Sequence, residues 1–136
     1  MDTISQPVGL MMFEGGRRYP LRATLAYDRK EPYEVRLLFP PGLEHRDMVL
    51  ARELLAGGLI EAATFGGMRV WPAGGVCGVV CVGWTGPAGE ARLEVPAVSV
   101  ACFLDLTYCL VLEGGEPPRA DIDAGIAAIL ADGGTR

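Results

Sequence analysis

The strongest secondary-structure signal of the chain lies in residues 19–39, YPLRATLAYDRKEPYEVRLLF. Apolar residues alternate with polar or small ones over 19–27 and again over 33–39, which is the period of strands with one buried face. Residues 28–32 between them have the composition of a turn. We therefore predict a β-hairpin here, with a weaker strand at about 5–13 pairing with its first strand.

Three segments further along the chain also predict strands, and two of them form a second hairpin. Residues 67–72 predict a short strand, whereas residues 76–84 are apolar on both faces, which indicates a strand buried on both sides. After a turn at 85–89, residues 91–95 alternate again and complete the second hairpin. Together with a short apolar stretch at residues 48–50, these segments predict antiparallel β-sheets of about seven strands.

Two to three helices are predicted, and the longer ones follow the strands. The first is short and is ended by Gly57-Gly58, since glycine often closes a helix. The last opens near Pro118, because proline suits the first turn of a helix. The predicted helices cover residues 51–56, 96–109 and 118–131, with a loop at 112–118. This order predicts an α+β fold in a single domain of residues 1–136.

Composition and charge narrow the classes of function. The chain has 136 residues, is 50% hydrophobic and 21% charged, and has a mean hydropathy of +0.27, which excludes a disordered chain. This apolar excess indicates a homo-oligomer, because a protomer can bury apolar surface on its neighbour. A net charge of −5 argues against nucleic acid as a partner. Five cations could still form a small local patch, or simply occupy solvated turns: Arg17, Arg18, Arg22, Arg29 and Lys30.

No catalytic, metal-binding or cofactor-binding pattern is present in the sequence. The single histidine, His45, follows a turn, and Ser99 lacks the flanking glycines of a nucleophile elbow. The four cysteines do not have the spacing of zinc ligands, so we interpret them as small buried thiols. No glycine-rich phosphate-binding motif occurs. We expect neither an enzyme nor a cofactor, and a cytoplasmic protein without signal peptide or transmembrane segment.

Three motifs in order resemble one known family. They are LARELLAGGL at residues 50–59, MRVWP at 68–72 and GEARLEVP at 89–96. The SsgA-like sporulation and cell-division proteins of actinomycetes carry similar A-R-[DE]-L-L-x-x-G-L, R-V-W-P and G-E-A-x-L-E-x-P segments. The resemblance covers residues 19–104.

The resemblance implies a fold, an assembly and a role. The family is similar in fold to the Whirly single-stranded-DNA-binding proteins and assembles as a bell-shaped trimer. Its members are non-enzymatic and act in septum placement and cell-wall remodelling during sporulation, partly by recruiting FtsZ. We therefore expect FtsZ or paralogous family members as partners, and concentration at division septa. The alternative is a Whirly-like single-stranded nucleic-acid-binding module, which would need a basic, aromatic-lined groove.

We expect the protein-binding surface on residues 98–111, because this segment is apolar on more sides than one buried face can use. Large anchors of the kind found at interfaces occur there and in the second motif. The expected interface residues are Phe103, Leu106, Tyr108, Leu110 and Trp71. The alternative is that the helix lies wholly within the protomer core.

Overall fold

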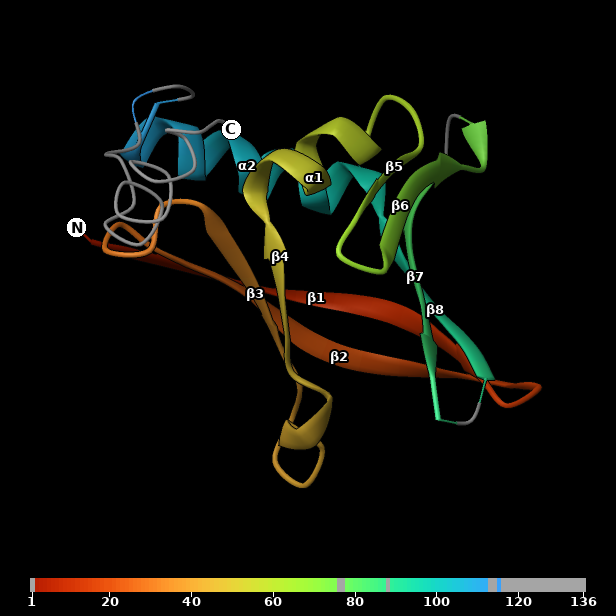
Figure 1. Ribbon diagram of the computed structural model, residues 1–136. Helices are drawn as coiled ribbons and strands as arrows, with labels where there is room; N and C mark the ends of the chain where they lie inside the picture. Colours follow the sequence, from red (N-terminus) through yellow and green to blue (C-terminus); the bar gives the residue numbers. More distant parts are fainter. Residues whose placement is uncertain (1, 76–77, 88, 113–114, 116–136) are drawn as a thin grey trace, which may run out of the picture.

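Among the residues that the structure describes, eight antiparallel strands form one continuous sheet, and two α-helices lie on the same side of it (Figure 1). The computed structural model describes residues 2–75, 78–87, 89–112 and 115. The strands are β1 (Thr3–Glu14), β2 (Arg17–Asp28), β3 (Glu34–Leu38), β4 (Met48–Ala51), β5 (Ala63–Phe65), β6 (Met68–Ala73), β7 (Val79–Gly86) and β8 (Gly89–Pro96). The helices are α1 (Arg52–Gly58), α2 (Ala97–Leu110) and the short 3-10 helix η1 (Glu44–Arg46). The strand order across the sheet is β4-β3-β2-β1-β8-β7-β6-β5.

The β1–β2 hairpin is the centre of the sheet. Its two strands pair along all twelve residues of each, and a two-residue turn joins them. Gly15 and Gly16 form this turn with φ of +60° and +77°, a left-handed conformation that favours glycine at both positions. β1 pairs with β8 only over Met11–Glu14, so this short contact joins the two four-stranded halves.

The sheet curls because a short connection joins its two edge strands. β4 ends at Ala51 and β5 begins at Ala63, so residues 52–62 run from one edge to the other. Eight strands laid flat would be about 34 Å wide. The connection, seven residues of which form α1, reaches about 25 Å at most. The edges must therefore approach each other, and α1 lies across the enclosed face.

The core lies between the sheet and the two helices. Alternate side chains of each strand point toward the helices, whereas their neighbours point to the other side of the sheet, which we call the open face. The buried sheet residues include Val8, Leu10, Met12, Leu25, Val35, Leu37, Val70, Val80, Val82, Leu93 and Val95. Leu54 and Leu55 of α1 pack on them together with Val100, Phe103 and Leu104 of α2.

α2 buries one stripe and leaves apolar side chains outside it. Its buried residues are Val100, Phe103, Leu104 and Thr107, the spacing of a single helix face. On the opposite side Val98 is 71% exposed and Leu106 is 47% exposed. The apolar residues of this helix therefore occupy more than one face, as the sequence predicted.

The structure confirms the antiparallel α+β fold, both hairpins and the helix after Pro96, and corrects several details. The described residues form eight strands in one sheet instead of about seven in several, because β5, of three residues, is too short to show a period. Gly57 and Gly58 belong to α1 and do not follow it. The predicted final helix at 118–131, and most of the loop at 112–118, lie outside the described residues.

Candidate functional site

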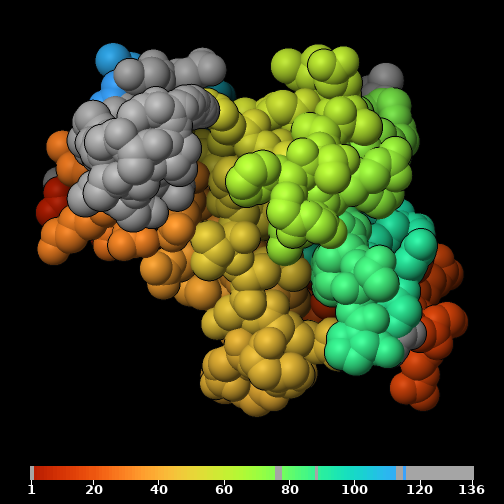
Figure 2. Space-filling model, in the orientation of Figure 1, coloured from red at the N-terminus to blue at the C-terminus, as the bar shows by residue number. Residues whose placement is uncertain are grey.

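A hollow of about 700 Å³ lies where the β1–β2 turn meets β6, β7 and β8. In Figure 1 the β7–β8 end and the β1–β2 turn approach each other at the lower right, and Figure 2 shows them as neighbouring surface there. Arginines and aromatic residues dominate its lining, and we call it the arginine groove. The residues that define the groove are Phe13, Arg17, Arg18, Arg69, Trp71, Gly83 and Arg92.

Strand register places five of these residues in one row across the sheet. Arg69 lies opposite Gly83, Gly83 opposite Arg92, Arg92 opposite Phe13, and Phe13 opposite Arg18. Residues that are directly opposite on neighbouring antiparallel strands share a face. The neighbours of this row in sequence point into the core, so the row lies on the open face, opposite the helices.

Two guanidinium groups of the groove lie over aromatic rings. Cζ of Arg69 is 4.4 Å from the Trp71 ring centroid, and Cζ of Arg92 is 4.0 Å from that of Phe13. The far edge of the indole rests on Gly83, where a Cβ atom would come within 3.0 Å of Cζ3 and 3.1 Å of Cη2 of Trp71. Such cation–π contacts orient the guanidinium groups, and the N–H edges of Arg69 stay available to a ligand.

The carboxylates at the groove are largely engaged. Nη2 of Arg46 in η1 lies 2.7 Å from Oε1 of Glu14, and this hydrogen bond holds the pKa of Glu14 below its ordinary value. Arg92 pairs with Glu94 at 3.1 Å between Nη2 and Oε2. Among the described residues, Arg69 has no ion pair. The groove is therefore an exposed basic site in an acidic protein.

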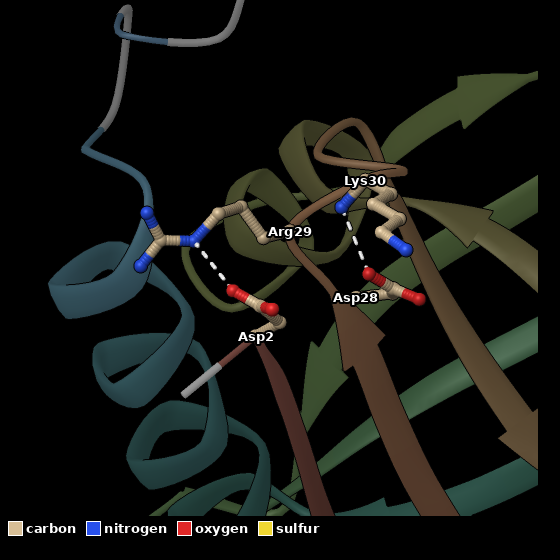
Figure 3. A network of polar contacts seen from close by, with 4 residues as sticks. All are labelled: Asp2, Asp28, Arg29 and Lys30. Carbon is tan, nitrogen blue, oxygen red and sulfur yellow. Dashed lines mark hydrogen bonds and ion pairs between the residues drawn. The ribbon is translucent and has the colours of Figure 1, made fainter.

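The structure spreads the expected cation cluster along the β1–β2 hairpin, with two cations at each end and Arg22 in the middle of β2. Arg17 and Arg18 line the groove, whereas Arg29 and Lys30 lie at the other end beside acidic residues (Figure 3). Nε of Arg29 is 3.6 Å from Oδ1 of Asp2, and the backbone N–H of Lys30 donates to Oδ1 of Asp28 at 2.8 Å. Only the first pair of cations therefore contributes to the groove.

The structure places the expected interface residues in three different environments: the core, the surface of α2 and the arginine groove. Phe103 is fully buried in the core, and Tyr108 lies with its ring 4.2 Å from the Arg52 guanidinium. Leu110 is partly buried against the core, and Leu106 is exposed. Trp71 belongs to the arginine groove on the other side of the sheet. Of the residues of α2 that were expected at an interface, only Leu106 is exposed, so the predicted interface on this helix consists of Leu106 and its exposed neighbours.

Those neighbours form a second surface, the outer face of α2. Four exposed residues follow the helical repeat along it: Val98, Cys102, Leu106 and Cys109. Asp105 is the charged residue beside them. This face and the arginine groove lie on opposite sides of the molecule.

The cysteine prediction is correct for one residue and wrong for two. Cys81 is buried, and burial raises the pKa of its thiol, which keeps it protonated and unreactive. Cys102 and Cys109 are exposed instead of buried, because they lie on the outer face of α2. Cys77 lies outside the described residues.

Within the described part of the chain, no group of His, Cys, Asp or Glu residues could hold a metal ion. His45 is exposed in η1. Nor does any described helix have the length and apolar character needed to cross a membrane.

Sequence reasoning missed Arg69 and Arg92 as site residues. Arg69 lies in the MRVWP motif, two positions before Trp71, and Arg92 lies in the GEARLEVP motif, two positions from a glutamate on either side. An arginine two positions before a tryptophan on a strand was the available signal, since residues i and i+2 share a face. Their convergence with Phe13 and Arg18 depends on long-range pairing that the local pattern does not contain.

Comparison with known proteins agrees with the motifs. The family model "Streptomyces sporulation and cell division protein, SsgA" matches residues 21–116. SsgB of Streptomyces coelicolor, a sporulation-specific cell division protein, is 41% identical over 115 residues, which cover 83% of this chain and 84% of the relative. SsgB of Frankia casuarinae is 34% identical over 138 residues, covering 99% of this chain and 96% of the relative.

Two solved structures are similar along most of the chain. The SsgA-like sporulation-specific cell division protein of Thermobifida fusca has a TM-score of 0.77 at 36% identity, covering 93% of this chain and 94% of the other. A structure from work on SsgB mutations that correlate to longitudinal cell division during sporulation of Streptomyces coelicolor has a TM-score of 0.74 at 38% identity, with coverage of 84% and 92%. The chain therefore belongs to the SsgA family of sporulation and cell division proteins.

Proposed function

We propose that the protein is a non-catalytic adaptor that places or recruits septum and cell-wall machinery during sporulation-specific cell division. The observation that carries this proposal is the presence of two exposed surfaces on opposite sides of one protomer. The outer face of α2 is apolar, and the arginine groove is basic and aromatic. A protein with two surfaces of different chemistry can hold two different neighbours at once, which is what an adaptor requires.

The first surface supports a homo-oligomer, and we propose a bell-shaped, Whirly-like trimer. Val98 and Leu106 expose large apolar areas two turns apart on the outer face of α2, with Leu112 just beyond its end. Exposed apolar patches of this kind mark protein–protein contacts. Neighbouring copies that cover this face would also account for the 50% apolar composition of a small chain.

The second partner is a cell-division protein, with FtsZ and paralogous family members as the candidates, and the adaptor concentrates at septa. The test is retention of purified FtsZ from the source organism by the immobilised protein, together with the septation phenotype of a deletion strain. Retention and irregular or missing sporulation septa are expected. No retention of FtsZ or of a paralogue, with normal septa in the deletion strain, would contradict the proposal.

A single-stranded nucleic-acid-binding module is the second candidate function. The observation in its favour is the groove itself, because arginines and aromatic rings are the elements of such sites. The net charge of −5 opposes it, since a polyanion is repelled by an acidic protomer. Binding of a fluorescent dT12 oligonucleotide at physiological salt separates the two: we expect none at micromolar protein.

A further inference from the structure

The arginine groove carries more positive charge than its own carboxylates neutralise. Its lining contains four arginines and two glutamates, in a chain of net charge −5. One of the two, Glu14, is already paired with Arg46, which lies outside the groove lining. Among the described residues, Arg17, Arg18 and Arg69 have no ion pair. Charge complementarity therefore calls for an anionic partner.

The stacked guanidinium groups favour carboxylates over bases. Arg69 lies over the ring of Trp71 and Arg92 over that of Phe13, so each arginine occupies a ring face that a base would need for stacking. The same contacts hold the planar guanidinium in place, so that it can form a bidentate pair with a carboxylate at low entropic cost. Glu90, also in the lining, repels a phosphate chain, which is charged at every nucleotide, more strongly than a peptide charged at every third residue.

The row of cations has a regular spacing. Arg69 and Arg92 are two strands apart with Gly83 between them, and Arg92 and Arg18 are two strands apart with Phe13 between them. Two strand spacings amount to about 10 Å. A polypeptide in the polyproline II conformation advances about 9 Å in three residues and returns to the same face, so side chains three positions apart match this spacing.

We infer that the arginine groove binds an extended acidic segment of a partner protein, whose carboxylates lie about three residues apart. Arg69, Arg92 and Arg18 receive these carboxylates in turn, Arg92 through the N–H groups that do not contact Glu94. The inference deepens the proposed adaptor function and rests on it, because it assigns to the groove the chemistry of the second partner.

Gly83 makes room for the Trp71 indole in the middle of the row. A Cβ atom at this position would press on the far edge of the indole and displace the ring that supports Arg69. Gly83 is therefore a positioning residue that acts through Trp71.

Tryptophan fluorescence gives a direct test, since the chain has two tryptophans and both Trp71 and Trp84 line the groove. The full-length protein is titrated with a 12-residue peptide that has Glu at every third position and Ser or Gly elsewhere. We expect a saturable change in emission. Arg69→Ala should weaken binding at least tenfold, and Arg69→Lys should give an intermediate affinity because it keeps the charge and loses the planar fork.

The matched control is Arg36→Ala, which removes one exposed arginine from β3, outside the groove. It changes the net charge equally and should alter the affinity less than twofold. The same peptide with Gln in place of Glu should not bind. Thermal melts of every variant should coincide with that of the unmodified protein, which confirms that folding is unchanged.

Three outcomes would overturn the inference. The first is no saturable change in emission with the Glu peptide up to millimolar concentration. The second is tighter binding of dT12 than of the peptide, which would assign the groove to nucleic acid. The third is a changed oligomeric state in Arg69→Ala, which would assign the groove to a contact between copies of this chain.

A cellular experiment separates the inference from the proposed function. In a deletion strain complemented with Arg69→Ala, we expect fewer sporulation septa at unchanged protein abundance, and normal septation with Arg36→Ala. Normal septation with Arg69→Ala would overturn the role of the groove and leave the adaptor proposal standing. Normal septation in the deletion strain itself would overturn the adaptor proposal.

Discussion

Arg52 shows at the scale of one residue how the two helices are tied together. It is 1% exposed, and its guanidinium lies 4.2 Å from the Tyr108 ring centroid and 5.3 Å from that of Tyr27. Nη1 donates to the backbone carbonyls of Thr107 at 3.2 Å and Val111 at 2.7 Å. Carbonyls at the end of a helix lack donors within the helix, and cations are favourable there. The first residue of α1 thus fixes the end of α2.

Replacing Arg52 with Met should destabilise the protein while keeping the volume of the side chain. The loss of buried, charge-assisted hydrogen bonds leaves a helix-terminal carbonyl without its donor, which costs about 2–3 kcal/mol of unfolding free energy. Urea denaturation measures the difference. Arg36→Met, at an exposed position of β3, is the control and should change stability by less than about 0.5 kcal/mol. Equal stability of the two variants would contradict the role assigned to Arg52.

The Glu14–Arg46 pair predicts a specific dependence on pH. Arg46 lowers the pKa of Glu14 from its ordinary value of 4.5, so the folded state favours the carboxylate. A depressed pKa stabilises the fold above the ordinary value, and this stabilisation is lost as the pH falls through the lower, folded value. The stability difference between the native chain and Arg46→Gln should therefore be constant above about pH 5 and shrink below pH 4.5. A difference that grows on acidification in urea titrations would refute this assignment.

At the scale of elements, α1 touches β6 so closely that its last residue has no room for a side chain. A Cβ atom on Gly58 would collide with Cγ1 of Val70 and lie 2.8 Å from its Cβ. This contact explains why glycine occurs inside a helix, where it is normally unfavourable by about 1 kcal/mol relative to alanine. Gly58, the second of the two glycines predicted to end α1, instead brings the helix onto the sheet.

The two adjacent glycines should therefore respond in opposite directions to alanine. Gly58→Ala should lower the unfolding free energy by about 1–3 kcal/mol, because overpacking outweighs the gain in helix propensity. Gly57→Ala should raise it by up to about 1 kcal/mol, since no described atom lies within 4 Å of its Cβ position. Thermal denaturation of both variants gives the signs. Two changes of the same sign would show that packing against Val70 does not decide the outcome.

At the scale of the whole molecule, the arrangement of two surfaces follows from the curl of the sheet. The helices cover the enclosed side, so α2 presents its second face outward, whereas the open face carries the arginine groove (Figure 1). Assembly through α2 would leave the groove accessible on the opposite side. The protomer can therefore oligomerise and bind a partner without competition between the two surfaces.

Leu106→Asp tests this assembly. Leu106 is 47% exposed on the outer face of α2, so the variant should fold, and a charge placed in a contact between copies should break it. Light scattering should give about three times 14.4 kDa for the native chain and 14.4 kDa for the variant. Ile60→Asp, at an exposed apolar residue just after α1, is the control and should keep the native mass. A native chain of 14.4 kDa at micromolar concentration would exclude the trimer.

Local sequence patterns were sufficient to predict the longer strands and α2, because the geometry of a single element sets which of its side chains are buried. The alternation over residues 19–39 predicts β2 and β3, and the apolar run after Pro96 predicts α2. Both predictions work because buried and exposed side chains recur along the sequence with the period of the strand or the helix. The family motifs likewise lie within single elements or adjacent ones. β5 was beyond this reasoning, because three residues are too few to establish a period.

Tertiary structure alone decided where the site lies. Phe13, Arg18, Arg69 and Arg92 come from four different strands, and only the pairing of β1 with β8 and of β7 with its neighbours brings them into one row. A shift of one residue in any of these pairings would move a strand's side chains to the opposite face. Register is set by the packing of the whole core, which local periodicity does not encode. The sequence therefore indicated the family and the α+β fold, and long-range strand pairing created the groove.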